Sequence, residues 1–417
     1  MSTTPLTSDF DVAVIGGGAA GLAASGFCAR SGLRTVLIEK NRQMGRKLAI
    51  TGKGRCNVTN DCTREELLEN VPVNPKFLYA AVSSFGPADT MRLFESLGVE
   101  LKVERGRRVF PVSDCARDIV SALNRYSSGA VRVHAAVESV HGAGTGFELR
   151  LRGRCFETIR ARAVLICTGG VSYPATGSTG DGYRFAAGFG HTVIPPKPSL
   201  VPLVSDDPFC AQCMGLSLKN TGVAFYRGEK RLYAEQGEML FTHFGVSGPV
   251  ILSSSAHLRS FPVTMRLDLK PALDEKTLDR RVTGDLAGNS NRLLQNSLDR
   301  LLPMKLIHPF IMRTGLDPEK RSRDITRAER GVIVALLKRL EIKVTGTRPV
   351  SEAIVTSGGV SVRELKPTTM ESKIVRGLFF AGEVIDVDAY TGGYNLQIAF
   401  STAMAAARGV ISYINEG

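Results

Sequence analysis

Three glycines near the N-terminus are spaced as in a loop that binds phosphate. Gly16, Gly18 and Gly21 form a G-x-G-x-x-G pattern directly after the apolar run 12–15. In such a loop the first glycine makes a tight turn, the second lets backbone approach a pyrophosphate, and the third lets helix and strand pack closely. The helix that the pattern predicts over 19–31 would meet the negative charge with its N-terminus. The spacing therefore predicts a dinucleotide site.

An acidic residue after the next predicted strand indicates the kind of dinucleotide. The apolar run 34–38 ends at Glu39, 18 residues after Gly21. A carboxylate in this place accepts hydrogen bonds from an adenosine ribose and repels a 2′-phosphate. The pattern therefore favours FAD or NAD over NADP.

The rest of the N-terminal half supplies elements that must hold this loop. Apolar residues at a period near 3.6 predict helices, whereas alternating or continuous apolar runs predict strands. Glycines 142, 144 and 146 lie between two alternating runs, so they predict a hairpin turn and not a second nucleotide site. The predicted helices cover 75–97, 115–126 and 183–188, and the predicted strands cover 106–111, 131–140, 147–152 and 161–168.

The middle of the chain changes its pattern several times. The proline-rich residues 194–198 predict a linker between domains. Short strand-like runs fill 200–268, helical spacing covers 271–340, and 342–362 is strand-like again. This order predicts an inserted β subdomain that itself carries a helical insert.

The C-terminal segment returns to residues suited to a cofactor. Residues 377–382 are predicted to be a strand followed by Glu383, and Gly392 and Gly393 precede a helix predicted over 398–414. A Gly-Gly opening leaves free N–H groups at the N-terminus of a helix. In flavoproteins such a helix faces the pyrimidine edge of the flavin, which gains negative charge on reduction. Together with the N-terminal loop, this segment favours FAD as the tightly held cofactor.

Size and composition are those of an ordinary globular protein. The 417 residues are enough for two or three domains, and 43% of them are hydrophobic. No segment approaches the roughly 18 uncharged apolar residues that a membrane helix needs, so no membrane partner is expected. The first ten residues lack the basic and apolar regions of a secretory signal. We therefore expect a cytoplasmic protein.

The chain is basic, with 53 Lys and Arg against 40 Asp and Glu and a formal net charge of +13. The excess is uneven: 300–348 holds 12 basic and 5 acidic residues, and 30–64 holds 9 and 2. Such a surface attracts polyanions, including RNA. A solvated basic protein that also binds an anionic cofactor has the same composition. Charge alone therefore leaves both interpretations open.

Eight cysteines are scattered along the chain, as is typical of buried thiols in a cytosolic protein. Cys210 and Cys213 have C-x-x-C spacing, but no second pair and no nearby histidine completes a zinc site. The pair is interpreted either as a redox pair or as two unrelated cysteines. No metal site is expected.

Four ordered motifs resemble those of one protein family. They are GGGAAG at 16–21, GRKLAITGKGRCNVTN at 45–60, LFTHFGVSGP at 240–249 and GEVIDVDAYTGGYNLQIAFSTA at 382–403. With them the chain resembles the BaiN/RdsA (YhiN-like) family of bacterial FAD/NAD(P)-dependent oxidoreductases. The family includes a dehydro-bile-acid reductase and a ribosomal-RNA dihydrouridine synthase. The stretch 386–397, DVDAYTGGYNLQ, is more similar to the reductase branch.

The resemblance implies an α/β fold: a glutathione-reductase-like FAD-binding Rossmann domain with an inserted β-barrel-like subdomain that carries a helical cap. It implies that FAD is bound without a covalent link. Only one dinucleotide fingerprint is present, so NADH or NADPH, a small-molecule electron donor, is expected to visit the flavin transiently. The implied domains are 1–196 and 357–417 for FAD, 197–270 and 341–356 for the β subdomain, and 271–340 for the helical insert.

The fingerprint and the resemblance together assign residues to FAD. The glycine loop is expected to hold the pyrophosphate, Glu39 the adenosine ribose, and the backbone of Val137 the adenine. Arg46 and Lys47 either neutralise phosphate charge or belong to a solvated loop. Glu383 stands where this class commonly has Asp, near the ribityl chain. The full set is Gly16, Gly18, Ala20, Gly21, Glu39, Lys40, Arg46, Lys47, Thr51, Arg55, Cys56, Asn57, Val137, Thr168, Gly169, Gly170, Gly382, Glu383, Gly393, Asn395 and Leu396.

Three residues are candidates for the proton donor of a flavin-dependent reduction. Flavin N5 delivers the hydride, and the protein supplies a proton from the far side of the substrate's double bond. Tyr390 lies just before the Gly-Gly pair, and His243 lies in the third motif at a predicted domain junction. Cys56 is a candidate by analogy with other flavin reductases of uracil. A lone histidine can equally be a structural residue.

Four functions fit these residues. The leading one is NAD(P)H-driven reduction of an activated C=C bond, with uridine in large-subunit ribosomal RNA as substrate, because the basic surface suits phosphate contacts. The second is reduction of a conjugated enone in a steroid-like molecule such as a dehydro-bile acid. The third is oxidation of a small amine by oxygen. The fourth is a non-catalytic flavin-containing RNA-binding factor.

Overall fold

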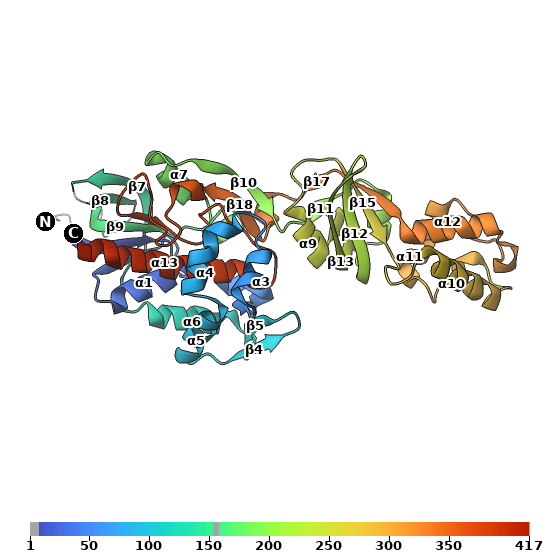
Figure 1. Cartoon of the computed structure of the whole chain (residues 1–417), viewed down its shortest axis with the longest axis horizontal. Coiled ribbons are helices and arrows are strands. Elements are labelled where there is room, and N and C mark those ends of the chain that lie inside the picture. Colours follow the sequence, from blue (N-terminus) through green and yellow to red (C-terminus); the bar gives the residue numbers. More distant parts are fainter. Residues whose placement is uncertain (1–7, 145, 153–157, 417) are drawn as a thin grey trace. The chain divides into compact units, whose positions relative to one another are not determined.

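The computed structural model describes residues 8–144, 146–152 and 158–416, and its contacts divide the chain into two compact units (Figure 1). Unit 1 is made of residues 1–199 and 350–417, and unit 2 is made of 200–349. Thr145, within the segment predicted to be a hairpin turn, the N-terminal residues 1–7 and Cys155 fall outside the described part. Unit 1 contains both the N-terminal glycine loop and the C-terminal segment.

Unit 1 is built on a seven-stranded sheet with the order β6-β2-β1-β9-β8-β7, in which β19 also pairs with β9. β1 lies parallel between β2 and β9, so that Val14 is opposite both Leu37 and Leu165. All three residues are fully buried, as is typical of a parallel sheet covered on both faces. The strands are β1 (Ser8–Ile15), β2 (Thr35–Ile38), β6 (Val131–Val133), β7 (Ala136–Ala143), β8 (Gly146–Arg152), β9 (Thr158–Ile166) and β19 (Leu378–Phe380).

Helix α1 (Ala19–Arg30) connects β1 to β2 and lies beside α13 (Tyr394–Glu416), as Figure 1 shows. It also packs on α6 (Ala116–Tyr126). A Cβ atom at Gly26 would lie 2.3 Å from the ring of Tyr126, so a glycine is needed where these two helices approach. The N-terminal helix thus packs against helices from two distant parts of the chain.

Smaller elements surround this core. Strands β3 (Thr59–Asn60), β5 (Arg108–Pro111) and β4 (Leu101–Glu104) form a separate antiparallel sheet. The remaining elements of unit 1 are α2 (Arg46–Ile50), η1 (Thr51–Gly54), α3 (Arg64–Glu69), η2 (Pro75–Leu78), α4 (Tyr79–Ser84), α5 (Pro87–Ser96), η3 (Pro174–Thr176), α7 (Asp181–Gly188), β10 (Val193–Ser199), η6 (Val350–Glu352), β18 (Val355–Val360) and η7 (Val362–Glu364).

The single helix predicted over 75–97 is wrong. The segment forms η2, α4 and α5, and the chain is extended at Phe85, between α4 and α5. Pro87 explains the break, because it lacks an N–H group and disfavours helical backbone in the residue before it. The 3.6-residue apolar period continues through the break, so periodicity alone could not reveal it.

Two further predictions of local structure are wrong. The strand predicted over 131–140 is two strands, β6 and β7, at opposite ends of the sheet order. The linker predicted over 194–198 belongs to β10, which pairs antiparallel with β18. The ladder is irregular between Ile194 and Lys197, and this irregularity takes Pro195 and Pro196 out of the regular pairing.

The other predicted elements of unit 1 are confirmed to within a few residues. The strand before the glycine loop is β1, the helix after it is α1, and the next strand is β2. The predicted hairpin joins β7 to β8. The helices predicted over 115–126 and 183–188 are α6 and α7. The last helix begins at Tyr394, directly after Gly393, and so starts before the predicted residue 398.

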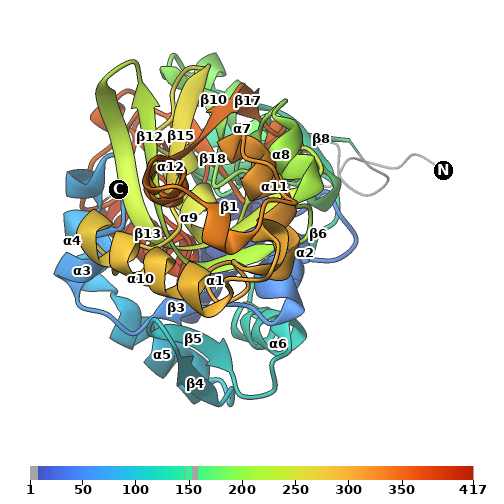
Figure 2. The ribbon, with the colours of Figure 1, turned by 90° about the vertical axis from the view of Figure 1, so that its right-hand side faces the viewer.

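Unit 2 combines an antiparallel sheet with helices around one core. The sheet order is β16-β15-β12-β13-β14-β11-β17. Leu278, Phe310 and Leu337 of the helices share a core with Phe225 and Met265 of the sheet. Figures 1 and 2 show the helices labelled in this region. The strands are β11 (Leu203–Val204), β12 (Ser217–Arg227), β13 (Lys230–Thr242), β14 (Gly245–Ser247), β15 (Val263–Asp268), β16 (Leu340–Val344) and β17 (Gly346–Thr347), and the helices are α8 (Pro208–Gln212), α9 (Pro249–Ser255), α10 (Glu275–Gly288), η4 (Leu294–Asn296), α11 (Met304–Thr314), η5 (Ser322–Asp324) and α12 (Arg327–Lys338).

The described residues contain neither a candidate membrane-spanning helix nor a candidate metal cluster. None of the helices in residues 8–144, 146–152 and 158–416 is long and apolar enough to cross a membrane. Within the same ranges, His, Cys, Asp and Glu side chains form no group of three that could hold a metal ion.

Two Gly→Ala substitutions in unit 1, one in the contact between α1 and α6 and one outside it, should have opposite effects. Gly26→Ala should lower the free energy of unfolding by about 1–3 kcal/mol, because the new methyl group must displace the buried Tyr126 ring. Gly188→Ala, at the exposed end of α7 with no atom within 4 Å of its Cβ position, should be neutral or stabilising by less than about 1 kcal/mol. Urea unfolding of both variants measures the difference. Equal stabilities would contradict the packing described here.

Candidate dinucleotide and acceptor site

Close backbone contacts explain two of the loop glycines. Gly16 has φ +103°, and a Cβ atom there would lie 2.5 Å from the carbonyl oxygen of Cys167. A Cβ atom at Gly21 would lie 1.8 Å from the carbonyl oxygen of Gly16. The loop therefore lies against both the end of β9 and the first turn of α1, and only glycine fits at these positions.

Gly18 has the opposite surroundings, because no atom lies within 4 Å of the position of its Cβ. It is the N-cap of α1, and no side chain caps the helix there. The first turn contains no acidic residue, and Ala20 within it is small and buried. Space, unpaired helix N–H groups and the positive end of the helix dipole coincide at Gly18, so these residues fit the pyrophosphate of a dinucleotide.

Glu39 links the end of β2 to the glycine loop. Its Oε2 atom accepts a hydrogen bond from the Gly17 N–H at 2.8 Å. Its Oε1 atom accepts from the backbone N–H and the side-chain amide of Asn41, at 2.8 and 2.7 Å. Arg46 donates to Asn41 Oδ1 at 2.9 Å. The carboxylate thus holds the loop in place, and its contact with a ribose stays a prediction.

The two predicted lysines form ion pairs. Lys40 Nζ lies 2.6 Å from Asp181 and also contacts Thr179. Lys47 Nζ lies 2.6 Å from Glu383 Oε2 and donates to Ser172 Oγ at 2.6 Å. Lys47 and Glu383, predicted from motifs at opposite ends of the chain, therefore meet in one cluster.

Glu383 is the centre of that cluster. Its Oε1 atom accepts from the Thr356 N–H at 2.8 Å and from Ser172 Oγ at 2.9 Å. Burial acts to raise the pKa of Glu383, but the charge of Lys47 and the hydrogen bonds outweigh it, so the pKa lies below its ordinary value. Glu383 is therefore a carboxylate at neutral pH.

The segment after β9 passes close to this cluster. A Cβ atom at Gly170 would lie 2.3 Å from Thr356 Oγ1 and 3.1 Å from Glu383 Oε1. Gly169 has φ +72°, and the hydroxyl of Thr168 is buried without a hydrogen-bond partner. The predicted residues 168–170 are thus brought beside Glu383.

Two predicted residues of the loop 51–57, Arg55 and Thr51, are held by protein groups. Arg55 pairs with Glu104 and Asp114 at 2.5 Å, and its guanidinium lies 4.2 Å from the Phe110 ring centroid. Thr51 Oγ1 donates to the Leu48 carbonyl at 2.7 Å. These contacts give both side chains a structural role, and their contact with FAD stays a prediction.

The next two residues of this loop are enclosed. Cys56 is fully buried with φ +61°, and burial raises the pKa of its thiol to about 12. The side-chain oxygen of Asn57 is buried without a hydrogen-bond partner. A thiol in this state keeps its proton but presents no surface to a substrate, which weighs against Cys56 as a proton donor.

The other two proton-donor candidates lie in different units. Tyr390 belongs to unit 1, where its backbone N–H donates to the Asn70 carbonyl at 3.0 Å. His243 belongs to unit 2, is exposed, and stacks edge-on against Phe244 with ring centroids 5.0 Å apart. Of these two candidates, Tyr390 is the one that shares a unit with the glycine loop.

The C-terminal glycines lie at close contacts. A Cβ atom at Gly382, which has φ +77°, would lie 3.1 Å from the Cβ of Ala20. A Cβ atom at Gly393 would lie 2.3 Å from the Thr59 carbonyl oxygen. The first turn of α1, which holds Ala20, and the segment that holds Gly382 are therefore neighbours, as the cofactor prediction requires.

Three remaining predicted residues have mainly structural contacts. Asn395 uses its side-chain amide to bind the N–H and carbonyl groups of Ala389, at 2.9 and 2.7 Å. Leu396 packs against the core of unit 1. Val137 is buried in β7 beside an irregularity in the pairing with β8. Their part in binding FAD stays a prediction.

The sequence reasoning missed the residues that hold the loop 386–390. Asn74 Nδ2 donates to the backbone carbonyl of Asp386 at 2.7 Å and to its carboxylate at 3.0 Å. Asp388 is 1% exposed; its Oδ2 accepts from Ser199 Oγ at 2.7 Å, while its Oδ1 has no partner. The sequence offered one sign of this arrangement, namely the two aspartates that are separated by one residue inside the fourth motif.

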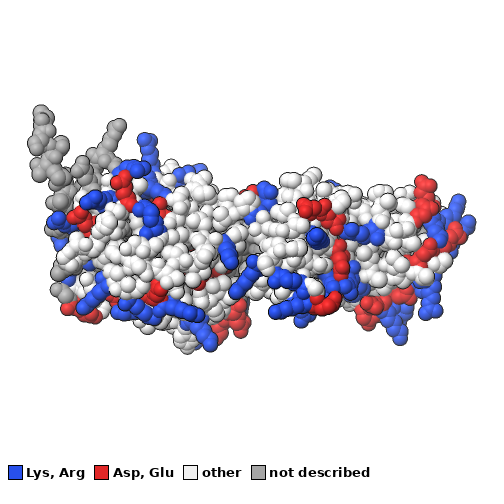
Figure 3. Space-filling model, turned by 90° about the horizontal axis from the view of Figure 1, so that it is seen from above, with Lys and Arg blue, Asp and Glu red and all other residues white. Residues whose placement is uncertain are grey.

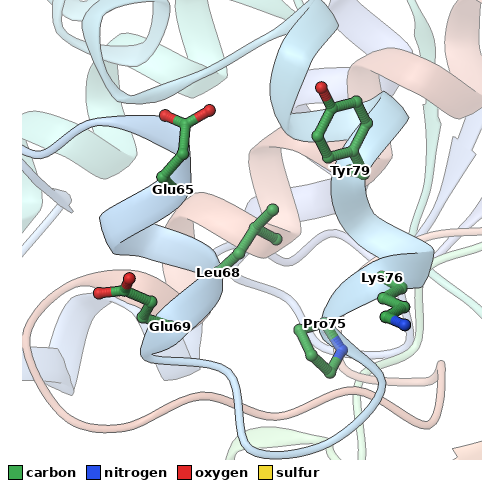
Figure 4. A pocket seen from close by; sticks show the side chains of 6 residues that line it. All are labelled: Glu65, Leu68, Glu69, Pro75, Lys76 and Tyr79. Carbon is green, nitrogen blue, oxygen red and sulfur yellow. The ribbon is translucent and has the colours of Figure 1, made fainter.

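A pocket lies on the elements that hold this loop. Figure 4 shows it between α3 and the segment η2–α4, with a volume of about 530 Å³. Asn70 directly follows α3, and Asn74 precedes η2. The pocket is lined by Glu65, Leu68, Glu69, Pro75, Lys76 and Tyr79, none of which was predicted from the sequence.

Comparison with known proteins places the chain in a family. Residues 10–409 match the family described as HI0933-like protein Rossmann domain. The chain belongs to this family. It is 32% identical over 411 residues to the ribosomal RNA dihydrouridine synthase of Escherichia coli, with 97% of this chain and 98% of that protein covered. It is 30% identical over 408 residues to the 3-dehydro-bile acid delta(4,6)-reductase of Clostridium scindens, with 95% and 98% covered.

A solved structure supports the fold. The 3-ketosteroid delta1-dehydrogenase from Sterolibacterium denitrificans has a TM-score of 0.50 and 14% sequence identity, with 97% of this chain and 100% of that chain covered. The α/β class with a Rossmann-type FAD-binding domain is confirmed, as is the family resemblance of the four motifs. This HI0933-like protein is an FAD-dependent oxidoreductase.

Asn74 is predicted to hold the loop 386–390 through its side chain, whereas Asn70 holds it through its backbone. Asn74→Gly removes two hydrogen bonds, each worth about 1 kcal/mol, and tolerates the left-handed φ of 54° at this position. Backbone amides of 387–390 should then exchange hydrogen about tenfold faster or more. Asn70→Ala keeps the carbonyl that binds Tyr390 and serves as the matched control. Mass spectrometry measures the exchange in both variants. Equal exchange rates would show that the Asn74 side chain does not hold the loop.

Asp388 predicts a specific pH dependence of stability. Burial raises the pKa of Asp388, and the hydrogen bonds from Ser199 and Ser357 only partly oppose this. The folded protein therefore holds this proton at a pH where the unfolded chain has lost it. Stability is lost as pH rises from the ordinary Asp value through the raised value, by about 1.4 kcal/mol per pH unit.

Asp388→Asn removes this titration while keeping an acceptor for Ser199. The variant should gain stability relative to the natural protein as pH rises above about 4, and the gain should then level off once Asp388 is ionised. Thermal unfolding of both proteins across this range measures the difference. A difference independent of pH would show that Asp388 titrates normally.

Proposed function

We propose that this protein reduces uridine to dihydrouridine in large-subunit ribosomal RNA, with NADH or NADPH as electron donor. The observation that carries the proposal is the similarity to the ribosomal RNA dihydrouridine synthase of Escherichia coli, which extends over nearly the full length of both chains. The net charge of +13 supports it, because contacts to phosphate dominate the binding of nucleic acids.

Unit 1 supplies the groups that would hold FAD. The N-terminus of α1 and the open side of Gly18 suit the pyrophosphate, and the strand end at Glu39 suits the ribose. Lys47 and Glu383 form a compensated charge pair beside the glycine-rich segment 169–170. When bound, FAD supplies the hydride that reduces a carbon–carbon double bond. The protein must orient the base, exclude water and provide one proton.

Tyr390 is the proposed source of that proton. It lies in the loop 386–390, which Asn74 and Asn395 hold by side-chain hydrogen bonds. A phenol held in place can donate a proton to a carbon acceptor that gains a hydride on the opposite face. Cys56, by contrast, is fully enclosed. His243 would need to come from unit 2.

A second function is favoured by a specific observation. The 3-dehydro-bile acid delta(4,6)-reductase of Clostridium scindens is similar over nearly the same length, at 30% identity. The chemistry is the same in kind, because an enone also accepts a hydride and a proton across a conjugated double bond. The two substrates differ in charge: RNA needs cations, and a steroid needs an apolar pocket. Salt therefore distinguishes them, since only RNA binding should weaken strongly in salt.

The test uses the purified FAD-containing protein, NADPH or NADH, and unmodified large-subunit ribosomal RNA without oxygen. We expect one uridine to gain two hydrogens, detected by mass spectrometry of the digested RNA. Gly18→Glu is the matched inactive control, because it places a carboxylate where the pyrophosphate would bind and should abolish FAD binding.

Other results would assign other functions. If NAD(P)H reduces the flavin but no uridine changes, the RNA proposal is wrong, and reduction of a steroid enone in the same assay would support the second function. Peroxide formed from a small amine in air, without NAD(P)H, would indicate an oxidase. A flavin that no donor reduces, in a protein that still binds RNA, would indicate a non-catalytic factor.

A further inference from the structure

Three polar side chains of unit 1 form a chain of hydrogen bonds outside the candidate site. Ser372 Oγ lies 2.8 Å from His191 Nε2, and His191 Nδ1 lies 3.1 Å from Glu364 Oε2. The His191 side chain has no exposed surface, and Ser372 is 3% exposed. His191 lies between α7 and β10, Ser372 lies in the loop before β19, and Glu364 belongs to η7. We call these three residues the His191 latch.

The partners of Ser372 determine where the protons of the latch lie. Ser372 Oγ accepts hydrogen bonds from the N–H groups of Ile374 and Val375, at 3.0 and 2.8 Å. A hydroxyl oxygen has two acceptor positions and one proton, so the Ser372 hydroxyl must donate its proton to His191 Nε2. The other ring nitrogen of His191 then carries a proton and donates to Glu364. The latch therefore requires a neutral imidazole with its proton on Nδ1.

The charge that faces this imidazole is that of Glu364. Burial acts to raise the pKa of Glu364, but the hydrogen bonds from Thr192 and His191 outweigh it, so the pKa lies below its ordinary value. Burial lowers the pKa of His191, and the contact with Glu364 only partly opposes this. From β19 the facing group is the uncharged ring of Phe380, with ring centroids 5.1 Å apart. Lysines of the same segment have other partners, namely Glu371 for Lys366 and the carbonyl of Arg363 for Lys373.

The latch joins the two strands that hold the C-terminal part of the candidate site. η7 follows β18 after one residue, and the last residue of β18, Val360, exchanges backbone hydrogen bonds with Val384 and Asp386 at 2.9 and 3.0 Å. Ser372 uses its N–H to bind the carbonyl of the first residue of β19, at 2.7 Å. Glu383 follows β19 after two residues. Both strands therefore connect the latch to the segment that contains the Glu383 carboxylate.

The order of serine, histidine and carboxylate is that of a hydrolase triad, but the surroundings exclude this role. A nucleophilic serine must reach its substrate with a free lone pair. The Ser372 oxygen is buried and accepts two backbone N–H groups. The three residues are therefore suited to hold the chain in place and not to attack a substrate.

We propose that the His191 latch is acid-sensitive: it holds the segment around Glu383 at neutral pH and releases this segment when His191 gains a second proton. A proton added to Nε2 would point at the Ser372 oxygen, which has no acceptor position left, so protonation requires this contact to break. β18 and β19 then lose a link, and the segment between them and FAD becomes free to move. The proposal does not depend on which acceptor the protein reduces, so its failure and that of the proposed function are separate.

Hydrogen exchange of the backbone amides of 372–378, measured by mass spectrometry between about pH 5 and 8, tests the latch. In the natural protein, protection corrected for intrinsic exchange should fall by up to about tenfold per pH unit below about pH 6.5, because the open state binds a proton that the closed latch excludes. His191→Gln keeps a donor and an acceptor but cannot be charged, so its protection should not change with pH. His141→Gln, which replaces an exposed histidine of β7, is the matched control and should behave as the natural protein.

Equal pH dependence in the natural protein and in His191→Gln would overturn the proposal. Nitrogen NMR of the natural protein provides a second test that does not require any variant to fold. At neutral pH, one of the six histidines should be uncharged with its proton on Nδ1, and it should remain so to a lower pH than the exposed histidines. A spectrum without this form would overturn the latch, and so would covalent labelling of Ser372 by a fluorophosphonate, which requires an accessible nucleophile.

Retention of FAD shows whether the latch acts on the candidate site. Flavin fluorescence of the purified FAD-containing protein should show faster release of FAD as pH falls through the same range, whereas His191→Gln should show a smaller change. Equal release from the two proteins would show that opening of the latch does not reach Glu383, and the proposed link to the site would be wrong. These readouts need no RNA and no steroid, so a failure to modify uridine leaves them unaffected.

Discussion

The ion pair between Lys47 and Glu383 is the interaction on which the candidate site depends most. Its two side chains are only 22% and 21% exposed, and the carboxylate is also bound by Ser172 and by the Thr356 N–H. Loss of either partner leaves an incompletely compensated charge in a partly buried place, which is strongly unfavourable. The pair joins residues 336 positions apart, so the two side chains meet only in the folded unit, in which β9 and β19 are paired. The site is therefore a product of the completed unit and not of its N-terminal motif alone.

Much of the site was predictable because its parts are local. The strand, glycine turn, helix and acid around Gly16 and Glu39 follow one another within about 30 residues, and each residue's role depends on its neighbours. The close approach at Gly21 is local, because it is made with the carbonyl of Gly16, whereas the approach at Gly16 is made with the distant Cys167. Lys47 and Glu383 were both among the residues that the sequence analysis assigned to FAD, although the sequence could not show that they bind each other.

What the sequence could not reveal depends on contacts between distant segments. Asn74 looks like an ordinary loop residue, and only the folded chain places its amide on Asp386. The raised pKa of Asp388 is mainly a consequence of burial, which no local pattern records. The prolines of 194–198 indicated a linker, yet pairing with β18 makes the segment a strand. In each case a local preference is weaker than tertiary packing.

Total charge is a poor guide to where a polyanion binds. Residues 200–349 hold 23 Lys and Arg against 16 Asp and Glu, and the rest of the chain holds 30 against 24, so the excess is similar in both parts. On the face seen in Figure 3, acidic residues lie among the basic ones. Ion pairs occur on all three helices of this region: Arg281 of α10, Arg313 of α11 and Arg330 of α12 each have a carboxylate partner. A cation that is paired with a carboxylate must give up that partner before it can contact another anion, so the arrangement of carboxylates matters as much as the number of cations for the attraction of a polyanion.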